Sequence, residues 1–447
     1  MSSEWTSFAF DQLKAPSKSA FAMGPFGSNI KAENFMTTGV PVIKGGNLKG
    51  TYLTDSFSDF LCQEKADELA SSKARSLDLV ITHRGTLGQV GLIPENANFP
   101  EYIVSQSQMK LSFDRALVDP YFIYYFLRSP LGQQRLLANK SQVGVPAIAQ
   151  ALTTVRQIKI NLPPLNLQRE ISNILRTLDD RITLLRETNK TLESIAQAIF
   201  KSWFVDFDPV RAKVEGRQPE GMDEATAALF PDSFEKSDLR LIPKGWAIKS
   251  LAETYDINPP RRLSKGTEST YLEMANVPTQ GFSVDAVIKR AFGSGTKFVN
   301  GDTLLARITP CLENGKTAFV DFLSEAEVGW GSTEFIVLRP KEPLPTFHAY
   351  LLCRTPEFRS YAIQSMSGTS GRQRVQNDVL GQFYISIPGD AVAEKFSESC
   401  EVIRQKITIN HSQAVTLASL RDTLLPRLIS GQLRLSAAED LTEGALS

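Results

Sequence analysis

The sequence predicts an α+β fold in which two homologous globular domains are separated by two long α-helices that form an intramolecular antiparallel coiled coil. The first observation is a repeat, because the stretch 163–206 returns 225 residues later and Pro163 then matches Pro388. The second is that both copies space apolar residues alternately by four and three, the pattern of a coiled-coil seam. A repeat of this length indicates one unit used twice, a globular part followed by a long helix.

The repeat and the two seams divide the chain into six consecutive segments. They are a first globular domain at 1–163, a first long helix at 164–205, a linker at 206–240, a second globular domain at 241–388, a second long helix at 389–434 and a C-terminal tail at 435–447. The linker is acidic and rich in Pro and Gly, which indicates an irregular connection with one short helix near 224–229.

The two long helices are defined by their seams. The first seam is Ile171, Leu175, Leu178, Ile182, Leu185, Asn189, Leu192, Ala196 and Ile199, and the second is Phe396, Cys400, Ile403, Ile407, Asn410, Ala414, Leu417, Arg421 and Leu424. Each contains one asparagine, a residue that often fixes register at some cost in stability, and Arg421 interrupts the second seam. The simplest arrangement pairs the two helices antiparallel, and the alternative packs each helix on its own domain. At about 1.5 Å per residue, 168–201 spans roughly 50 Å.

The two globular domains follow the same layout of short strands and helices. The predicted strands are 40–44, 79–82 and 109–113 in the first domain and 303–306 and 333–338 in the second. A predicted helix at 120–137 is mirrored by one at 346–364. The segments 77–80 and 301–304 also match, and each is followed by a lone arginine, Arg84 or Arg307. Similar scaffolds with different loops indicate two sites of the same kind that recognise different targets.

Composition is that of an ordinary globular protein of 447 residues, 42% of them hydrophobic. No stretch approaches 18 apolar residues and the N-terminus has no charged and apolar leader, so we expect neither a membrane span nor a signal peptide. The four cysteines and three histidines are scattered without metal-ligand spacing, which argues against a structural zinc site. We expect reduced core thiols in a cytoplasmic protein.

The net charge of zero hides a difference between segments. The segment 1–163 carries 16 basic and 13 acidic residues, and 241–388 carries 16 and 14. In contrast, 164–240 carries 11 basic and 14 acidic residues, and 389–447 carries 6 and 8. The globular domains are mildly basic and the helical parts acidic, which favours contact between a polyanion and the globular domains.

Several patterns typical of enzymes fail when they are followed residue by residue. Gly315-Lys316-Thr317 resembles the end of a phosphate-binding loop, but Pro310 stands where the earlier glycine is needed. Asn258-Pro259-Pro260 lacks the aromatic fourth residue of amino-methyltransferases, because Arg261 follows. No Asp or Glu is followed two positions later by Lys, and no nucleophile elbow is present. We therefore predict no enzymatic activity, no catalytic residue and no metal ligand.

The remaining polar residues gather on loops at equivalent places in both domains. Side chains of this kind reach DNA phosphates and base edges, and loop glycines let the backbone come close. The candidates in the first domain are Lys44, Asn47, Lys49, Arg84, Thr86, Gln106, Gln108, Lys140 and Gln142. The candidates in the second domain are Arg261, Arg262, Asn276, Arg307, Thr309, Thr333, Ser370, Arg372, Gln373 and Arg374. One such loop is more often simply solvated, but recurrence in both domains favours DNA binding.

Motifs at the ends of the helices carry a resemblance to a known family. The first helix follows Leu162-Pro163-Pro164-Leu165 and Gln168-Arg169-Glu170-Ile171 and ends at Ala198-Ile199-Phe200-Lys201-Ser202-Trp203-Phe204-Val205-Asp206-Phe207-Asp208-Pro209-Val210. The second helix ends at Leu424-Leu425-Pro426-Arg427-Leu428-Ile429-Ser430-Gly431, while Trp5 and Ile242-Pro243-Lys244-Gly245-Trp246 open the two domains. With these motifs, essentially the whole chain resembles the specificity subunit of type I restriction–modification enzymes.

The resemblance implies that the globular domains are target-recognition domains, that the long helices are spacers, and that the subunit catalyses nothing and binds no cofactor. It implies double-stranded DNA, two methyltransferase subunits and two restriction subunits as partners. S-adenosylmethionine, ATP and Mg would act on those partners, and no membrane is involved. Each domain would read one half of a bipartite site around an unread gap. Pro388-Gly389-Asp390 departs from the doubled proline of the first copy, so the resemblance is weaker there.

Two other classes of protein stay open at this point. A DNA methyltransferase or nuclease carrying its own DNA-reading domains would need the cofactor loop or the carboxylate–lysine pair that the sequence lacks. A coiled-coil scaffold without a nucleic-acid role would leave the glycine-rich basic loops of both domains without a purpose. Methyl transfer by the purified chain, or salt-sensitive DNA binding, separates the three classes.

Overall fold

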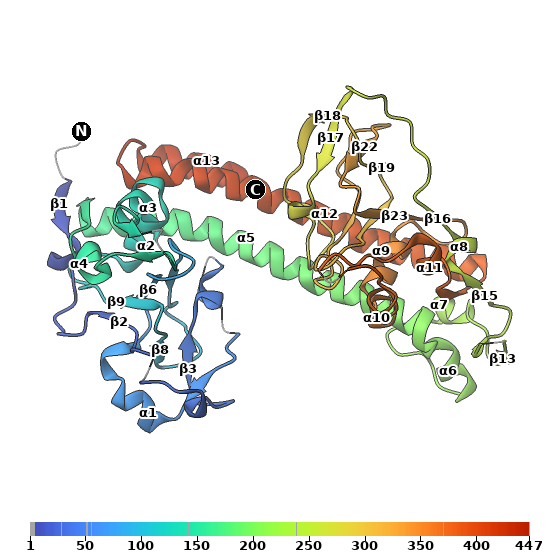
Figure 1. The fold of residues 1–447 in the computed structure, drawn as a ribbon, viewed down its shortest axis with the longest axis horizontal. Helices are drawn as coiled ribbons and strands as arrows, with labels where there is room; N and C mark the ends of the chain where they lie inside the picture. Colours follow the sequence, from blue (N-terminus) through green and yellow to red (C-terminus); the bar gives the residue numbers. More distant parts are fainter. Residues whose placement is uncertain are drawn as a thin grey trace. The chain divides into compact units, whose positions relative to one another are not determined.

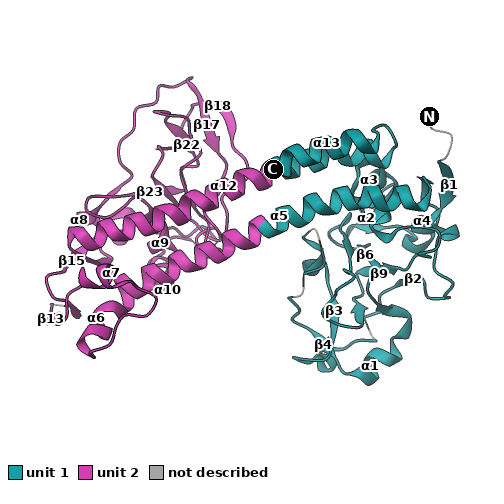
Figure 2. Cartoon of the chain, turned by 180° about the vertical axis from the view of Figure 1, so that it is seen from behind, with its two compact units in different colours: residues 1–184, 416–447 teal, residues 185–415 magenta. Residues whose placement is uncertain are grey.

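The computed structural model of the protein describes residues 5–27, 29–50, 52–54, 56–141, 144–237, 239–369 and 371–446 (Figure 1). The chain divides into two units, each coloured separately in Figure 2. Unit 1 consists of Met1–Leu184 and Thr416–Ser447, and unit 2 consists of Leu185–Val415. Each unit therefore contains one globular part and a portion of both long helices.

Unit 1 is built on two four-stranded sheets. The order β2-β9-β6-β7 joins the antiparallel strands Phe21–Met23, Gln108–Leu111, Leu79–Thr82 and Val90–Leu92. The order β4-β3-β8-β5 joins Phe60–Leu61, Val40–Ile43, Tyr102–Val104 and Lys73–Ala74, and here β3 and β8 run parallel. A further pair joins β1 (Thr6–Ala9) to β12 (Lys159–Leu162).

Unit 2 repeats this topology strand for strand. The order β16-β23-β20-β21 joins Tyr255–Ile257, Phe335–Pro340, Thr303–Ala306 and Thr317–Phe319. The order β18-β17-β22-β19 joins Ile288–Ala291, Glu268–Leu272, Gly329–Gly331 and Thr296–Phe298, with β17 and β22 parallel. β15 (Ala247–Ser250) pairs with β24 (Tyr384–Ile387), as β1 does with β12. The prediction of two homologous domains is confirmed.

Short elements complete the two globular parts. The short helices are α1 (Gln63–Glu68), α4 (Ala151–Arg156), α8 (Leu251–Thr254) and α11 (Asn377–Leu380). Single 3-10 turns occur at η1 (Phe10–Gln12), η2 (Ala32–Asn34), η3 (Gly45–Leu48), η4 (Ala70–Ser72) and η6 (Met274–Asn276). A small hairpin pairs β10 (Lys140–Ser141) with β11 (Ala147–Ile148).

The predicted helix at 120–137 is wrong as a single element, because it breaks into α2 (Pro120–Arg128) and α3 (Pro130–Leu136). A residue before proline is pushed out of the helical region, and Ser129 is extended at φ −67° and ψ 157°. Its side chain then caps α3 by accepting a hydrogen bond from the Gly132 N–H. The predicted helix at 346–364 breaks in the same way at Thr355, into α9 (Phe347–Arg354) and α10 (Pro356–Gln364).

The long helices are α5 (Leu165–Phe200) and α12 (Asp390–Ile429), and they pair antiparallel within unit 2. Asn189 of α5 contacts Asn410 of α12, whereas Phe200, further along α5, packs on Phe396, near the start of α12, at 6.1 Å between ring centroids. Every residue of both predicted seams is buried or half-buried. The heptad pattern thus identified the faces on which these helices pack.

The same two helices pair within unit 1, where Arg421 proves to be part of the seam. Its guanidinium lies 2.5 Å from a carboxylate oxygen of Asp179 on α5. The second oxygen of Asp179 accepts a hydrogen bond of 2.9 Å from the Tyr125 hydroxyl of α2. Asp179 is only 1% exposed. Arg421 therefore completes a buried polar contact between two helices and a globular part, instead of merely interrupting an apolar stripe.

The segment between α5 and the second globular part holds more regular structure than an irregular connection. A π-helical turn, η5 (Lys201–Asp206), follows α5, and then come α6 (Asp208–Val214), α7 (Glu224–Ala228) and a hairpin of β13 (Phe234–Lys236) with β14 (Leu241–Pro243). Aromatic ring contacts hold this segment in place, since the ring centroids of Trp203 and Phe230 lie 5.0 Å apart. After α12, residues Leu435–Leu446 form α13.

Three sequence expectations concern features that are absent. Among the residues that the structure describes, none of the helices is apolar and long enough to span a bilayer. Within the same ranges, His, Cys, Asp and Glu form no cluster suited to a metal ion. All four cysteines are free, and Cys353 and Cys400 lie in the core, where burial raises the pKa of each thiol to about 12.

Candidate nucleic-acid interface

In unit 1, three of the predicted loops meet at the ends of strands β6 and β9. The His83 N–H donates to the carbonyl of Ser107 at 3.0 Å, and the Ile148 N–H donates to the carbonyl of His83 at 2.9 Å. A third hydrogen bond joins the Gly85 N–H to the carbonyl of Pro146 at 2.8 Å. We call residues 82–86, 105–108 and 144–148 the first cradle.

Unit 2 has the same frame at the ends of β20 and β23. The Arg307 N–H donates to the carbonyl of Glu334 at 2.9 Å, and the Val375 N–H donates to the carbonyl of Arg307 at 3.0 Å. The Thr309 N–H donates to the carbonyl of Gln373 at 3.0 Å. We call residues 306–310, 332–335, 367–369 and 371–376 the second cradle.

These three matched hydrogen bonds show which positions of the two units correspond. Arg307 takes the place of His83, and Ile308 takes the place of Arg84. The sequence comparison of Arg84 with Arg307 is therefore wrong by one residue. The reason is strand pairing, because Thr82 faces Gln108 just as Ala306 faces Phe335, and the next residue begins each cradle.

The two cradles present different chemistry at the same backbone positions. In the first cradle His83 is buried, burial lowers its pKa, and its Nε2 donates to the carbonyl of Gln106 at 3.1 Å. Arg84 is instead exposed. In the second cradle the half-buried Arg307 donates from Nη2 to Oε1 of Gln376 at 2.9 Å.

The structure sorts the candidates of unit 1 by their exposure. The exposed ones are Lys49, Arg84, Thr86, Gln106 and Lys140. Lys44 is half-buried, lies over the Phe35 ring and pairs with Asp59 at 2.7 Å. Asn47 and Gln108 are buried and their amides bond within the unit. Gln142 lies outside the described residues.

A buried amide chain supports the first cradle, and one of its members escaped the sequence analysis. Gln89 accepts a hydrogen bond from the Thr82 hydroxyl at 3.0 Å and donates from Nε2 to the carbonyl of Gly45 at 3.1 Å. Gln108 donates to the Thr82 hydroxyl at 3.2 Å. A Cβ at Gly45 would stand 3.0 Å from the amide oxygen of Gln89, so a glycine suits this close approach. This chain ties the loop after β3 to the cradle.

The candidates of unit 2 are sorted in the same way. The exposed ones are Arg262, Thr333 and Arg372, and the half-buried ones are Arg261, Asn276, Arg307, Thr309, Gln373 and Arg374. Ser370 lies outside the described residues. Arg261 pairs at 3.1 Å with the fully buried Asp302, which Arg339 also contacts at 2.6 Å. The Asn276 amide donates to the carbonyl of Ala286 at 3.2 Å.

The second cradle contains an ion pair that the sequence analysis missed. Arg374 donates from Nη2 to Oε1 of Glu334 at 2.6 Å and from Nε to Oε2 at 2.9 Å. These hydrogen bonds hold the pKa of Glu334 below its ordinary value and raise that of Arg374. The DNA contacts were predicted from side chains that donate hydrogen bonds, such as Arg, Lys and amides. Glu334 only accepts hydrogen bonds, so the sequence did not mark it as a candidate.

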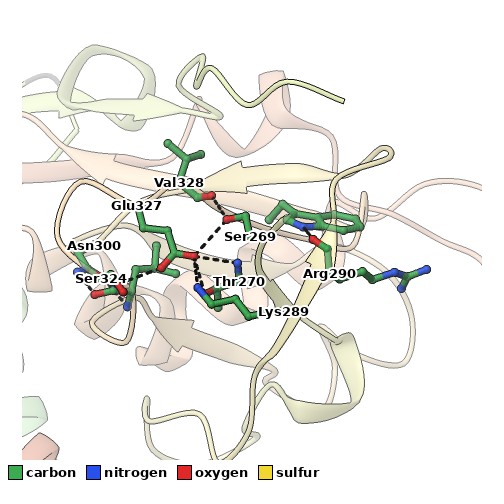
Figure 3. A network of polar contacts seen from close by, with 10 residues as sticks. Ser269, Thr270, Lys289, Arg290, Asn300, Ser324, Glu327 and Val328 are labelled. Atoms are coloured by element: carbon green, nitrogen blue, oxygen red, sulfur yellow. Dashed lines mark hydrogen bonds and ion pairs between the residues drawn. The ribbon is translucent and has the colours of Figure 1, made fainter. Parts of the chain in front are cut away.

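A second acidic network lies in the other sheet of unit 2 (Figure 3). The Oε1 atom of Glu327 accepts hydrogen bonds from the Thr270 N–H at 2.9 Å and from Lys289 at 2.7 Å. Burial opposes ionisation of Glu327, but the hydrogen bonds from Lys289 and Thr270 outweigh it and hold the pKa well below its usual range. This network fastens β17 to β18.

The chain thus repeats one α+β unit, and each copy carries one polar cradle framed by the same three backbone hydrogen bonds. A family model described as type I restriction modification DNA specificity domain matches residues 28–194. The HindI specificity subunit of Haemophilus influenzae is 24% identical over 382 residues, which cover 74% of this chain and 81% of that protein. The MjaIX specificity subunit of Methanocaldococcus jannaschii is 26% identical over 295 residues, which cover 63% and 62%.

Similarity of fold extends over nearly the whole chain. The crystal structure of a type I restriction–modification system S subunit from M. genitalium covers 95% of this chain and 96% of its own length, with a TM-score of 0.54 at 15% identity. The fold predicted from the sequence, two globular parts with two long paired helices, is confirmed. In sequence and fold, the chain is therefore similar to the specificity subunits of type I restriction–modification systems.

Proposed function

We propose that this chain is the DNA-recognition subunit of a type I restriction–modification system, and that units 1 and 2 each read one half of a bipartite, gapped site. The observation that carries the proposal is the pair of cradles, in which the same three backbone hydrogen bonds frame different side chains. A common frame lets both units approach DNA in the same way. Different side chains at the base edges then select different sequences.

Exposed residues of the cradles and of other loops in each unit supply the contacts in this proposal. Gln106 and Thr333 occupy matched positions, one residue before Ser107 and Glu334, and they are assigned to base edges. The remaining exposed candidates, which are cations and one hydroxyl, are assigned to contacts with DNA phosphates and sugars. These candidates are Lys49, Arg84, Thr86, Lys140, Arg262 and Arg372. The polar atoms of three other candidates already make hydrogen bonds within their own unit, so these residues position the loops instead of contacting DNA. They are Asn47, Gln108 and Arg261.

The proposal assigns no catalytic step and no cofactor to this chain. Two methyltransferase subunits, which carry S-adenosylmethionine, and two restriction subunits, which use ATP and Mg, complete the assembly in the cytoplasm. The helical parts, which carry an excess of acidic residues, serve as spacer and platform for these partners.

Methylation profiling tests the proposal directly. A host without other adenine methylation receives this chain together with the methyltransferase of its system, and the methylated positions are mapped. The expected result is a single motif with two short specified halves around an unspecified gap. Replacement of Gln106 by the residue at the matched position, as Gln106→Thr, should change only one half. A continuous motif, or methyl transfer by the purified chain alone, would contradict the proposal.

A further inference from the structure

Glu334 is a carboxylate in a cradle that we assign to a polyanion. Its carbonyl accepts from the Arg307 N–H, so it holds the position that Ser107 holds in unit 1. Ser107 brings no charge to its cradle. A negative charge near DNA phosphates weakens binding, and a carboxylate at this place therefore requires a contact that compensates for it.

Arg374 makes all the hydrogen bonds that the described part of the chain offers to this carboxylate. Its Nη2 and Nε donate to Oε1 at 2.6 and 3.0 Å, and Nε also donates to Oε2 at 2.9 Å. The pair carries no net charge, so the repulsion from phosphates is largely cancelled. The Oε2 atom accepts only this one bond within the described residues, and it keeps a free lone pair.

Glu327 shows how a carboxylate with a purely structural role differs (Figure 3). Its Oε1 accepts from the Thr270 N–H, the Thr270 hydroxyl and Lys289, and its Oε2 accepts from the Ser324 N–H at 3.2 Å. Each Oε2 accepts one bond, so the difference from Glu334 is that donors from three separate segments hold the Glu327 carboxylate. The Glu334 side chain is more exposed, at 23% against 15%, and a single residue holds it.

We propose that Glu334 is a specificity-determining residue of unit 2, and that its Oε2 accepts a hydrogen bond from the exocyclic amino group of an adenine or a cytosine. Both bases present such a donor in the major groove, and acidic side chains accept from it. Arg374 fixes the carboxylate and neutralises it, so Arg374 is a positioning residue. The inference rests on the proposed function, because it specifies what the second cradle reads.

Deletion of the amino group from the DNA tests this assignment. The full chain, assembled with its methyltransferase partners, binds duplexes that carry the site found by methylation profiling. Purine replaces each adenine of the second half-site in turn, and 2-pyrimidinone replaces each cytosine. The wild-type complex is expected to lose about tenfold or more in affinity at one position. The analogue that produces the loss identifies the base.

Variants of Glu334 then connect that loss to the carboxylate. Glu334→Ala should bind the natural and the amino-deleted site equally at that position and keep its preference in the first half-site. Glu334→Gln keeps the size of the side chain without its charge, and a smaller analogue penalty is expected. Glu327→Gln is the matched control and should keep the full wild-type penalty.

The outcomes separate this inference from the proposed function. The same analogue penalty in the wild type and in both Glu334 variants, at every position of the second half-site, would overturn the role of Glu334 and leave the proposed function intact. A wild-type complex without sequence preference in either half-site would overturn both.

Discussion

Asn410 donates a hydrogen bond of 2.9 Å from its Nδ2 to the Oδ1 of Asn189, across the pair of long helices in unit 2. Asn189 in turn donates from Nδ2 to the carbonyl of Ile407 at 3.0 Å. Each helix has one seam asparagine, and these two meet. A shift of either helix by one heptad would bury both amides against apolar side chains, which is costly. The pair therefore selects one register for α5 against α12.

Replacement of one seam asparagine should destabilise the protein. In Asn189→Leu, the amide of Asn410, which is 2% exposed, loses its acceptor, and we expect a loss of about 1–3 kcal/mol in the free energy of unfolding. The double variant Asn189→Leu with Asn410→Leu should recover most of this loss, because an apolar layer replaces the polar one. Urea denaturation measures both, with the exposed Thr191→Ala as the control. A double variant less stable than the single one would contradict this interpretation.

Breaking the buried ion pair of unit 1 should cost more. Arg421→Leu leaves the carboxylate of Asp179 charged and buried, and a loss of about 3 kcal/mol is expected. Adding Asp179→Asn removes the charge while it keeps an acceptor for the Tyr125 hydroxyl, and should restore much of the stability. Asp422→Asn, at an exposed carboxylate that also touches Arg421, should change stability by less than about 0.5 kcal/mol. In a protein that retains Arg421, Asp179→Asn should therefore lower the free energy of unfolding more than Asp422→Asn does. Equal losses in the two variants would contradict a buried ion pair between Asp179 and Arg421.

The spacer role makes a prediction about the gap in the DNA site. One added heptad in α5, with a matching heptad in α12 so that the asparagines still meet, should lengthen the unread gap. Neither half-site should change, because neither cradle is altered. Methylation profiling of the variant reports both quantities at once. A new base preference in either half would count against helices that act only as spacers.

Arg372 and Arg374 should behave differently although only one residue separates them. Arg372 is exposed, so Arg372→Ala should weaken binding at all sequences and reduce the salt dependence of affinity by about one unit of slope. Arg374→Ala frees the carboxylate of Glu334 and should relax sequence preference in the second half-site only. Binding measured at several salt concentrations, on matched and mismatched duplexes, distinguishes the two. Identical effects of the two variants would contradict the assigned roles.

The Glu327 network predicts how stability depends on pH. The folded-state pKa of Glu327 is depressed below its ordinary value of 4.5, so ionisation stabilises the fold above that pH. The contribution is lost as the pH falls through the folded-state pKa. Glu327→Gln should therefore lower the free energy of unfolding by about 1–2 kcal/mol at pH 7, and the difference should shrink in acid. A difference that grows between pH 7 and pH 3 would show the opposite linkage.

The scaffold was predictable because its signals are local. Heptad spacing identified both seams, and it also placed Asn189 and Asn410 where they meet. The proline signal at Pro130 was equally local, and the single helix expected at 120–137 overlooked it. Ser129 before that proline is both an unfavourable helical position and a good cap, so the break could have been predicted.

The cradles were less predictable because they depend on contacts between distant segments. The equivalence of Arg307 with His83 follows from which residues face each other across β6–β9 and β20–β23, and no local pattern reveals it. Exposure also depends on tertiary packing, so Gln106 and Gln108, two residues apart, have opposite environments. Glu334 can be recognised as a candidate only from the structure, which places Arg374 beside it.

Unit 1 is discontinuous, since its last part begins at Thr416, after all of Leu185–Val415. During synthesis, the apolar side of α5 at Leu175, Leu178 and Ile182 leaves the ribosome long before Leu417 and Leu424 exist to cover it. At about 5–20 residues per second, this wait lasts roughly twelve to fifty seconds. Termination of synthesis before Thr416 would leave this apolar side of α5 without that cover.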